Sequence, residues 1–272
     1  MLSMKDLKIP YLSIMILTII VLVSFFGKAL YSLSPYQLHP DLILLSPSYE
    51  HPFGTDRLGR DILARVIEGG KVSLTIGVLS AIISSLVGLM IGVISGFMKG
   101  WIDKGVVIMI DLFLTFPTFF LLLALISYMN ASVWILVFII SVTGWMGMAR
   151  MIRSESFAIS QKPYIKVLKL AGVSKVKIIL KYFTPVLAPI FFISFTFGVG
   201  GAILAESGLS FLGIGIMPPQ ISWGSVLSEG KGIVDIAPWV SFFPGLMIFL
   251  VVFCLVNISD FLQKFTNQKD SY

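Results

Sequence analysis

The chain contains 272 residues, of which 57% are hydrophobic and 12% are charged, and its formal net charge is +6. Soluble domains carry about 25% charged residues, so this composition excludes an ordinary soluble domain and favours a membrane protein. The single cysteine, Cys254, excludes an internal disulfide framework, and the two histidines, His39 and His51, lack the spacing of a metal site. We therefore expect no bound metal. The basic residues do not alternate with stacking aromatics, so we expect no nucleic-acid partner either.

Six apolar blocks follow one another along the chain. A spanning helix needs roughly 20 apolar residues, and a backbone in lipid must satisfy its own hydrogen bonds, which helices do. The first block runs into Gly27 and Lys28 without a small-residue cleavage pattern, so we interpret it as an uncleaved span. We predict an all-α polytopic fold with about six transmembrane helices, at roughly residues 10–30, 72–98, 105–128, 132–149, 186–205 and 240–258.

The distribution of basic residues predicts the orientation of these spans. If the N-terminus is cytoplasmic, 14 of the 20 Lys and Arg residues lie inside, including Lys5 and Lys8. The positive-inside rule therefore favours a multi-pass protein of the cytoplasmic membrane with both termini in the cytoplasm. We divide the chain into residues 1–71, the first span with an extracytoplasmic segment, and residues 72–272, the main transmembrane domain.

The second block carries a glycine at every fourth position: Gly88, Gly92 and Gly96. Small residues on one ridge of a helix allow a second helix to approach closely, which is how helices associate in lipid. We predict a close helix contact at this ridge. Static packing within the chain and a sliding contact with another helix or subunit both stay open.

Asp111 lies inside the third block, where a charge is costly unless it faces protein, water or the headgroups. It could line a solute path, or pair with Lys104 or Lys99 near the cytoplasmic headgroups. Its role is left open.

The cytoplasmic segment 150–185 contains eight basic residues and one acid. Pro163 is suited to a helix start, and Gly172 to a turn between two short amphipathic helices. One face of the first helix carries Tyr164, Val167, Leu168 and Ala171. Such helices could insert into a groove of a partner or lie on the anionic inner leaflet, and the spacing favours neither. The chain has no P-loop motif, so it is not expected to bind ATP itself.

The same segment resembles the coupling loop of ABC-importer permeases, the EAA region. Residues 164–172, YIKVLKLAG, followed by hydrophobic residues and Pro185, carry the likeness, although Val167 and Leu168 replace the family's paired alanines. Three further stretches are similar to the C-type permeases of dipeptide, oligopeptide and nickel importers. These are 51–61 (HPFGTDRLGRD), 111–117 (DLFLTFP), and 206–215 (ESGLSFLGIG) with 218–224 (PPQISWG). The likeness covers about residues 45–262.

This resemblance implies the transmembrane domain of a type I ABC importer. The implied partners are a homologous B-type permease, two ABC ATPases that use ATP and Mg, an extracytoplasmic solute-binding protein and membrane lipid. The chain would hold no cofactor and would not be an enzyme in its own right. The solute is expected to be a di- or oligopeptide, with nickel or a metal chelate as the alternative. A non-transport membrane scaffold is the alternative of a different class.

The resemblance also assigns roles to the residues. The coupling role falls on Tyr164, Val167, Leu168, Ala171 and Gly172. A charged cluster in the outer segment consists of Asp56, Arg57, Arg60 and Asp61. We expect this cluster to contact the solute-binding protein or brace an outer gate, with an internal salt-bridge structure as the open alternative.

Overall fold

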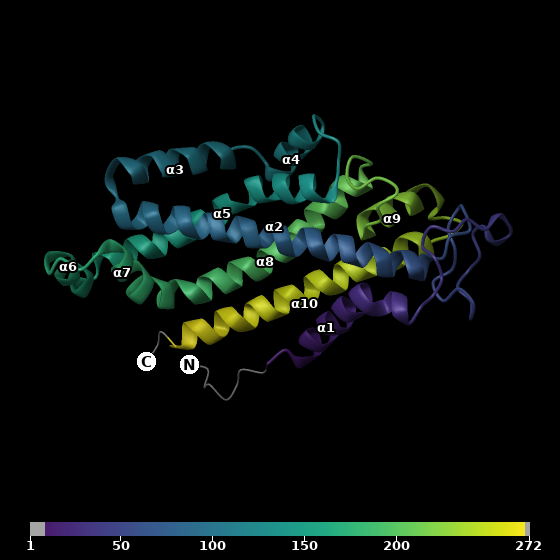
Figure 1. Ribbon diagram of the computed structural model, residues 1–272, viewed down its shortest axis with the longest axis horizontal. Coiled ribbons are helices and arrows are strands. Elements are labelled where there is room, and N and C mark those ends of the chain that lie inside the picture. The colour runs from purple at the N-terminus through teal and green to yellow at the C-terminus, as the bar shows by residue number, and fades with distance from the viewer. Residues whose placement is uncertain (1–8, 270–272) are drawn as a thin grey trace.

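A computed structural model describes residues 9–269, and Lys5 and Lys8 lie outside this range. Long helices lie side by side and form one elongated bundle (Figure 1). The helices are α1 Tyr11–Phe26, α2 Ile62–Met98, α3 Gly100–Leu114, α4 Thr118–Ile126, α5 Val133–Gln161, α6 Pro163–Leu170, α7 Lys175–Ile178, α8 Thr184–Phe211, α9 Trp223–Gly230 and α10 Trp239–Lys269.

Within residues 9–269, five helical segments are long and apolar enough to cross a membrane, and the bent pair α3–α4 makes a sixth if it counts as one span. The prediction of an all-α polytopic protein with about six spans is therefore confirmed. The helix α2 lies at the centre of the bundle and contacts α1, α3, α5, α8, α9 and α10.

The third predicted span is not one straight helix. The axes of α3 and α4 differ by 80° across a break at residues 115–117. Pro117 has no N–H to donate and disfavours helical geometry at Phe116, so the chain turns here although the residues stay apolar.

Four other spans, α2, α5, α8 and α10, are longer than the apolar blocks indicate. Asp61 caps α2 by accepting a hydrogen bond from the Ala64 N–H, so this helix begins ten residues before the predicted span. The expected boundary between residues 71 and 72 thus falls inside a continuous helix. The helix α5 is also longer than predicted, because it continues past residue 149 to Gln161.

The two ends of the bundle differ. One end holds α6 and α7, and the other holds the segment between α1 and α2 together with α9 (Figure 1). We call them the α6–α7 end and the α9 end. At the α9 end, Gly59 has a φ of 70°, and a Cβ there would lie 1.9 Å from the His39 carbonyl oxygen, so this turn requires glycine.

Candidate functional site

The helices α6 and α7 project from the end of the bundle (Figure 1). Lys162 ends α5, Pro163 begins α6 in the first-turn position that suits proline, and Ser174 caps α7. Between the two helices Gly172 has a φ of 74°. The predicted pair of short helices with a glycine turn is therefore present.

One side of this loop is part of the protein's own core. Ile165, Ile178 and Phe183 are fully buried in a cluster at the α6–α7 end, and Leu168 is half-buried against it. The sequence pattern missed Ile165, which lies off the predicted face. Leu168 therefore contributes to holding α6 on the bundle.

The opposite side of α6 exposes apolar groups. Tyr164 is 43% exposed, Val167 63% and Leu170 89%, and Ala171 is exposed as well. Leu170 was not predicted, because neighbouring residues of a helix point in different directions and the assumed face contained Ala171. Tyr164, Val167, Leu170 and Ala171 form a surface that we call the α6 face.

Lys169 connects the loop to the end of α2. Its ammonium lies 4.2 Å from the centre of the Phe97 ring. Burial, and then repulsion from Lys99 and Lys175, lowers the pKa of Lys169 below its usual value. Three lysines thus gather beside the Gly172 turn and give this side of the loop a positive field.

The glycine ridge lies against α5 of the same chain. A Cβ at Gly88 would lie 2.8 Å from the Trp145 carbonyl oxygen, and one at Gly96 would lie 2.6 Å from that of Arg153. At Gly92 the Ala149 carbonyl oxygen is 2.8 Å away. Each glycine therefore allows a backbone-to-backbone approach of α2 and α5 that a larger residue would prevent.

Asp111 does not pair with Lys104 or Lys99 as the sequence suggested. Its carboxylate accepts a hydrogen bond from Arg150 of α5, and both side chains are more than half exposed. About two turns away on α3, Asp103 accepts two hydrogen bonds from Arg153, at 2.5 and 2.7 Å. Two ion pairs therefore tie α3 to α5, and each joins residues too distant in sequence for local patterns to reveal.

Asp56 is the centre of an ion network at the α9 end. Its side chain is 2% exposed and accepts hydrogen bonds from Arg60 at 2.6 Å and Arg65 at 3.1 Å. Both arginines also bind Glu229 of α9, at 2.6 and 2.7 Å. Two positive and two negative charges thus join the outer segment, α2 and α9, which is the arrangement that the internal salt-bridge interpretation describes.

Asp61 serves as a second centre. In addition to capping α2, its carboxylate lies 2.8 Å from His51 Nδ1 and accepts a hydrogen bond from the Tyr31 hydroxyl at 2.9 Å. Burial, and then this hydrogen bond, raises the pKa of Tyr31 well above its usual value. Arg57 differs from the others in the cluster because it is exposed and its guanidinium donates to a backbone group, the Gly232 carbonyl oxygen.

Glu206 of α8 was not predicted as a functional residue, although an acid near the end of an apolar block is unusual. It is fully buried and accepts hydrogen bonds from Ser210 at 2.7 Å and Ser73 at 3.0 Å. The Ser73 hydroxyl in turn accepts from the backbone N–H of Trp223. Glu206 therefore connects α2, α8 and the start of α9.

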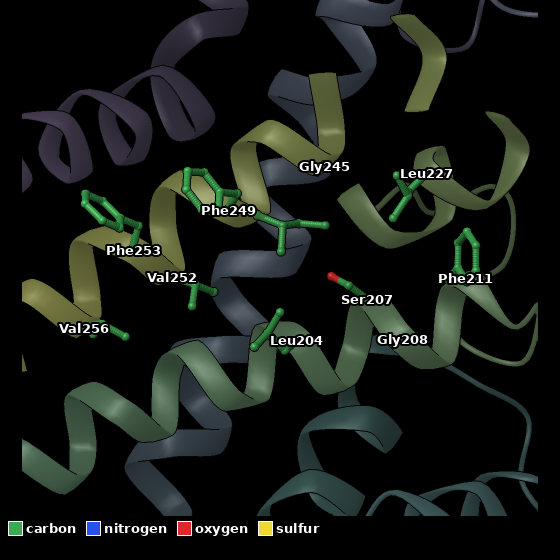
Figure 2. A pocket seen from close by; sticks show the side chains of 11 residues that line it. Leu204, Ser207, Gly208, Phe211, Leu227, Gly245, Phe249, Val252, Phe253 and Val256 are labelled. Carbon is green, nitrogen blue, oxygen red and sulfur yellow. The ribbon is translucent and has the colours of Figure 1, made fainter. Parts of the chain in front are cut away.

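A groove with a volume of 670 Å³ lies between α8 and α10 (Figure 2). Leu204 of α8 and Phe249 and Phe253 of α10 line it, and at one end Phe211 of α8 lies beside Leu227 of α9. Ser207 supplies the hydroxyl among these groups. The groove therefore suits apolar neighbours.

The family described as binding-protein-dependent transport system inner membrane component matches residues 88–269. The oligopeptide transport system permease protein OppC of Escherichia coli K12 is 37% identical over 220 residues, which are 81% of this chain and 73% of that protein. The dipeptide transport system permease protein DppC of Alkalihalophilus pseudofirmus is 32% identical over 268 residues, 98% of this chain and 88% of that protein.

Among solved structures, a chain of the MetNI methionine ABC transporter in an inward-facing conformation has a TM-score of 0.57 with this chain. The two are 15% identical over 73% of this chain and 96% of that one, so the likeness is one of fold.

Proposed function

Because the chain belongs to the family of binding-protein-dependent transport inner membrane components, we propose that it is one of two permease subunits of a peptide importer. The chain aligns with most of the length of two relatives, which are named as oligopeptide and dipeptide permeases. This membership favours the importer over a non-transport scaffold. Nickel import is the alternative that a solute measurement has to distinguish.

The observation that carries the coupling role is the α6 face. Exposed apolar groups that are mounted on a loop held by a buried core form an anchor for a groove in another protein. ATP hydrolysis with Mg belongs in this proposal to two ATPase subunits that bind the α6 faces of this chain and of its homologous partner. Closure of the ATPases would move α6 and, through it, α5 and α8.

The orientation follows from the same assignment. The α6–α7 end faces the cytoplasm, together with both chain termini, and the α9 end faces outward. Arg57 is then the exposed member of the outer cluster and the candidate contact for a solute-binding protein, whereas Asp56, Arg60 and Asp61 hold the outer segment and α9 in place.

The test is transport by the complete complex. The chain is reconstituted in proteoliposomes with its partner permease, the ATPases and the solute-binding protein, and uptake of a labelled dipeptide, a labelled hexapeptide and nickel is measured with and without ATP. We expect ATP-dependent uptake of peptide that requires the binding protein. ATP-dependent uptake of nickel without any uptake of peptide would contradict the peptide assignment.

A further inference from the structure

A second cavity opens on the bundle at the level of the membrane-spanning helices, and its lining differs from that of the groove in Figure 2. Its volume is 510 Å³, and α2, α4, α5 and α8 all contribute to its wall. The side chains with hydroxyl groups that line it are Ser84, Ser85, Thr118, Thr143 and Ser194.

Hydroxyl groups from four different helices have no reason to gather on a wall that meets lipid tails, because lipid offers them no hydrogen bond. Ser85 is the most informative of them. Its side chain is 3% exposed and lines the cavity, but its hydroxyl has no hydrogen-bond partner within residues 9–269. The hydroxyls of Ser84 and Thr143, in contrast, bond to carbonyl oxygens of their own helices. The hydroxyl is not sealed in the core but reaches the cavity, so Ser85 offers a free hydrogen-bonding group to a polar occupant.

Small and flexible residues complete the wall. Gly201 lines the cavity, and a Cβ at this position would meet nothing within 4 Å, so this glycine is not explained by packing inside the chain. Met148 and Met151 add thioether side chains, which adapt to irregular shapes. The Ser194 hydroxyl lies 3.9 Å from the Met151 sulfur, which is a weak acceptor, so this hydroxyl is also available to an occupant.

We propose that this cavity is the part of the solute path that this chain supplies, and that it holds the peptide backbone. Hydroxyl groups both donate and accept hydrogen bonds, as the amide N–H and C=O groups of a peptide require. The residues that line the cavity include no Asp, Glu, Lys or Arg, so the wall does not select for side-chain charge. The volume lies within the range of about 300–1,000 Å³ that is typical of small-molecule sites. The proposal rests on the proposed importer function.

Accessibility is the first test. Cys254, the native cysteine, is fully buried, so an introduced cysteine supplies the reactive thiol. In the reconstituted complex, Gly201→Cys should react with a charged, membrane-impermeant methanethiosulfonate, and a transported peptide should slow the reaction. The matched control is Leu22→Cys on α1, where the native side chain is 51% exposed and the apolar surroundings should keep the reagent away. If Gly201→Cys reacts no faster than Leu22→Cys, a lipid or a partner helix fills the cavity and the proposal is wrong.

Transport is the second test. Ser85→Ala removes a hydroxyl that has no partner among the described residues, so the fold should be unaffected. We expect peptide transported per ATP hydrolysed to fall roughly two- to tenfold, the loss of about one hydrogen bond. Ser141→Ala is the control, because this hydroxyl is equally buried but bonds to the Val137 carbonyl oxygen and does not line the cavity. Equal transport by Ser85→Ala and wild type would refute the proposal, whereas a wild-type complex that transports no peptide would refute the proposed function itself.

Discussion

The contact between α2 and α5 predicts that a large side chain at Gly92 disrupts the bundle. An ideal Cβ at Gly92 would lie 2.8 Å from the Ala149 carbonyl oxygen and 2.8 Å from the Ile152 Cβ. Ordinary contacts begin near 3.4 Å, so the helices would have to separate by about 0.6 Å before even a methyl group fits. Backbone atoms lie on one side of the contact, so a change of rotamer cannot relieve it.

The change Gly92→Leu adds three carbons beyond that methyl group. Overpacking in a well-packed core costs typically about 1–3 kcal/mol, and helix propensity returns less than about 1 kcal/mol when glycine is replaced. A net loss of one or two kcal/mol changes the ratio of folded to unfolded protein roughly 5- to 30-fold. We therefore expect a clear loss of assembled complex.

The measurement is the amount of intact complex that survives a series of heating steps in detergent, followed by size-exclusion chromatography. Gly105→Leu is the control, because this glycine also lies within a helix but a Cβ there would meet nothing within 4 Å. We expect the control to match wild type. If Gly92→Leu survives heating as well as Gly105→Leu, the reasoning about the α2–α5 contact is wrong.

Five further substitutions have expected outcomes. Val167→Asp should release the ATPases in co-purification while the permease keeps its thermal stability. Leu168→Asp should also lower that stability, because Leu168 is half-buried in the chain's own core. Retention of the ATPases by Val167→Asp would contradict the coupling role. Gly172→Ala should cost about 1 kcal/mol through its positive φ alone and should lower peptide uptake more than ATPase activity, and equal losses of both would argue against a coupling defect. Asp56→Asn should destabilise the permease by about 3–5 kcal/mol in a heating assay because it leaves a buried arginine poorly compensated, and Arg57→Ala, its exposed neighbour, should not.

Much of the fold could be predicted because spanning helices have a strong signal in the sequence. The break at residues 115–117 was missed because the residues around Pro117 stay apolar, and hydropathy does not report a change of direction. The extensions of α2 and α5 were missed for a related reason. Once a helix has formed, it continues through polar residues until a cap or a proline ends it, and the apolar block indicates only the part in lipid.

The site was predictable where it is local. The α6–α7 loop and its glycine turn follow from spacing within about twenty residues. Arg65 and Glu229 were not identified, because their contact joins positions 164 residues apart and each is an ordinary charged residue on its own. Glu206 had a recognisable signal, an acid at the edge of an apolar block, but its serine partners become visible only when α2 and α8 are brought together.

The length of α5 has a mechanical consequence. Its 29 residues make a rod about 44 Å long, which exceeds the roughly 30 Å of hydrocarbon that it crosses. If the rod tilts about the end opposite α6, each degree moves the end where α6 is attached by about 0.8 Å. The glycine contacts leave no slack of that size between α5 and α2. The two helices must therefore tilt together as one rigid unit, so that a tilt of only a few degrees displaces the attached α6 by several ångströms.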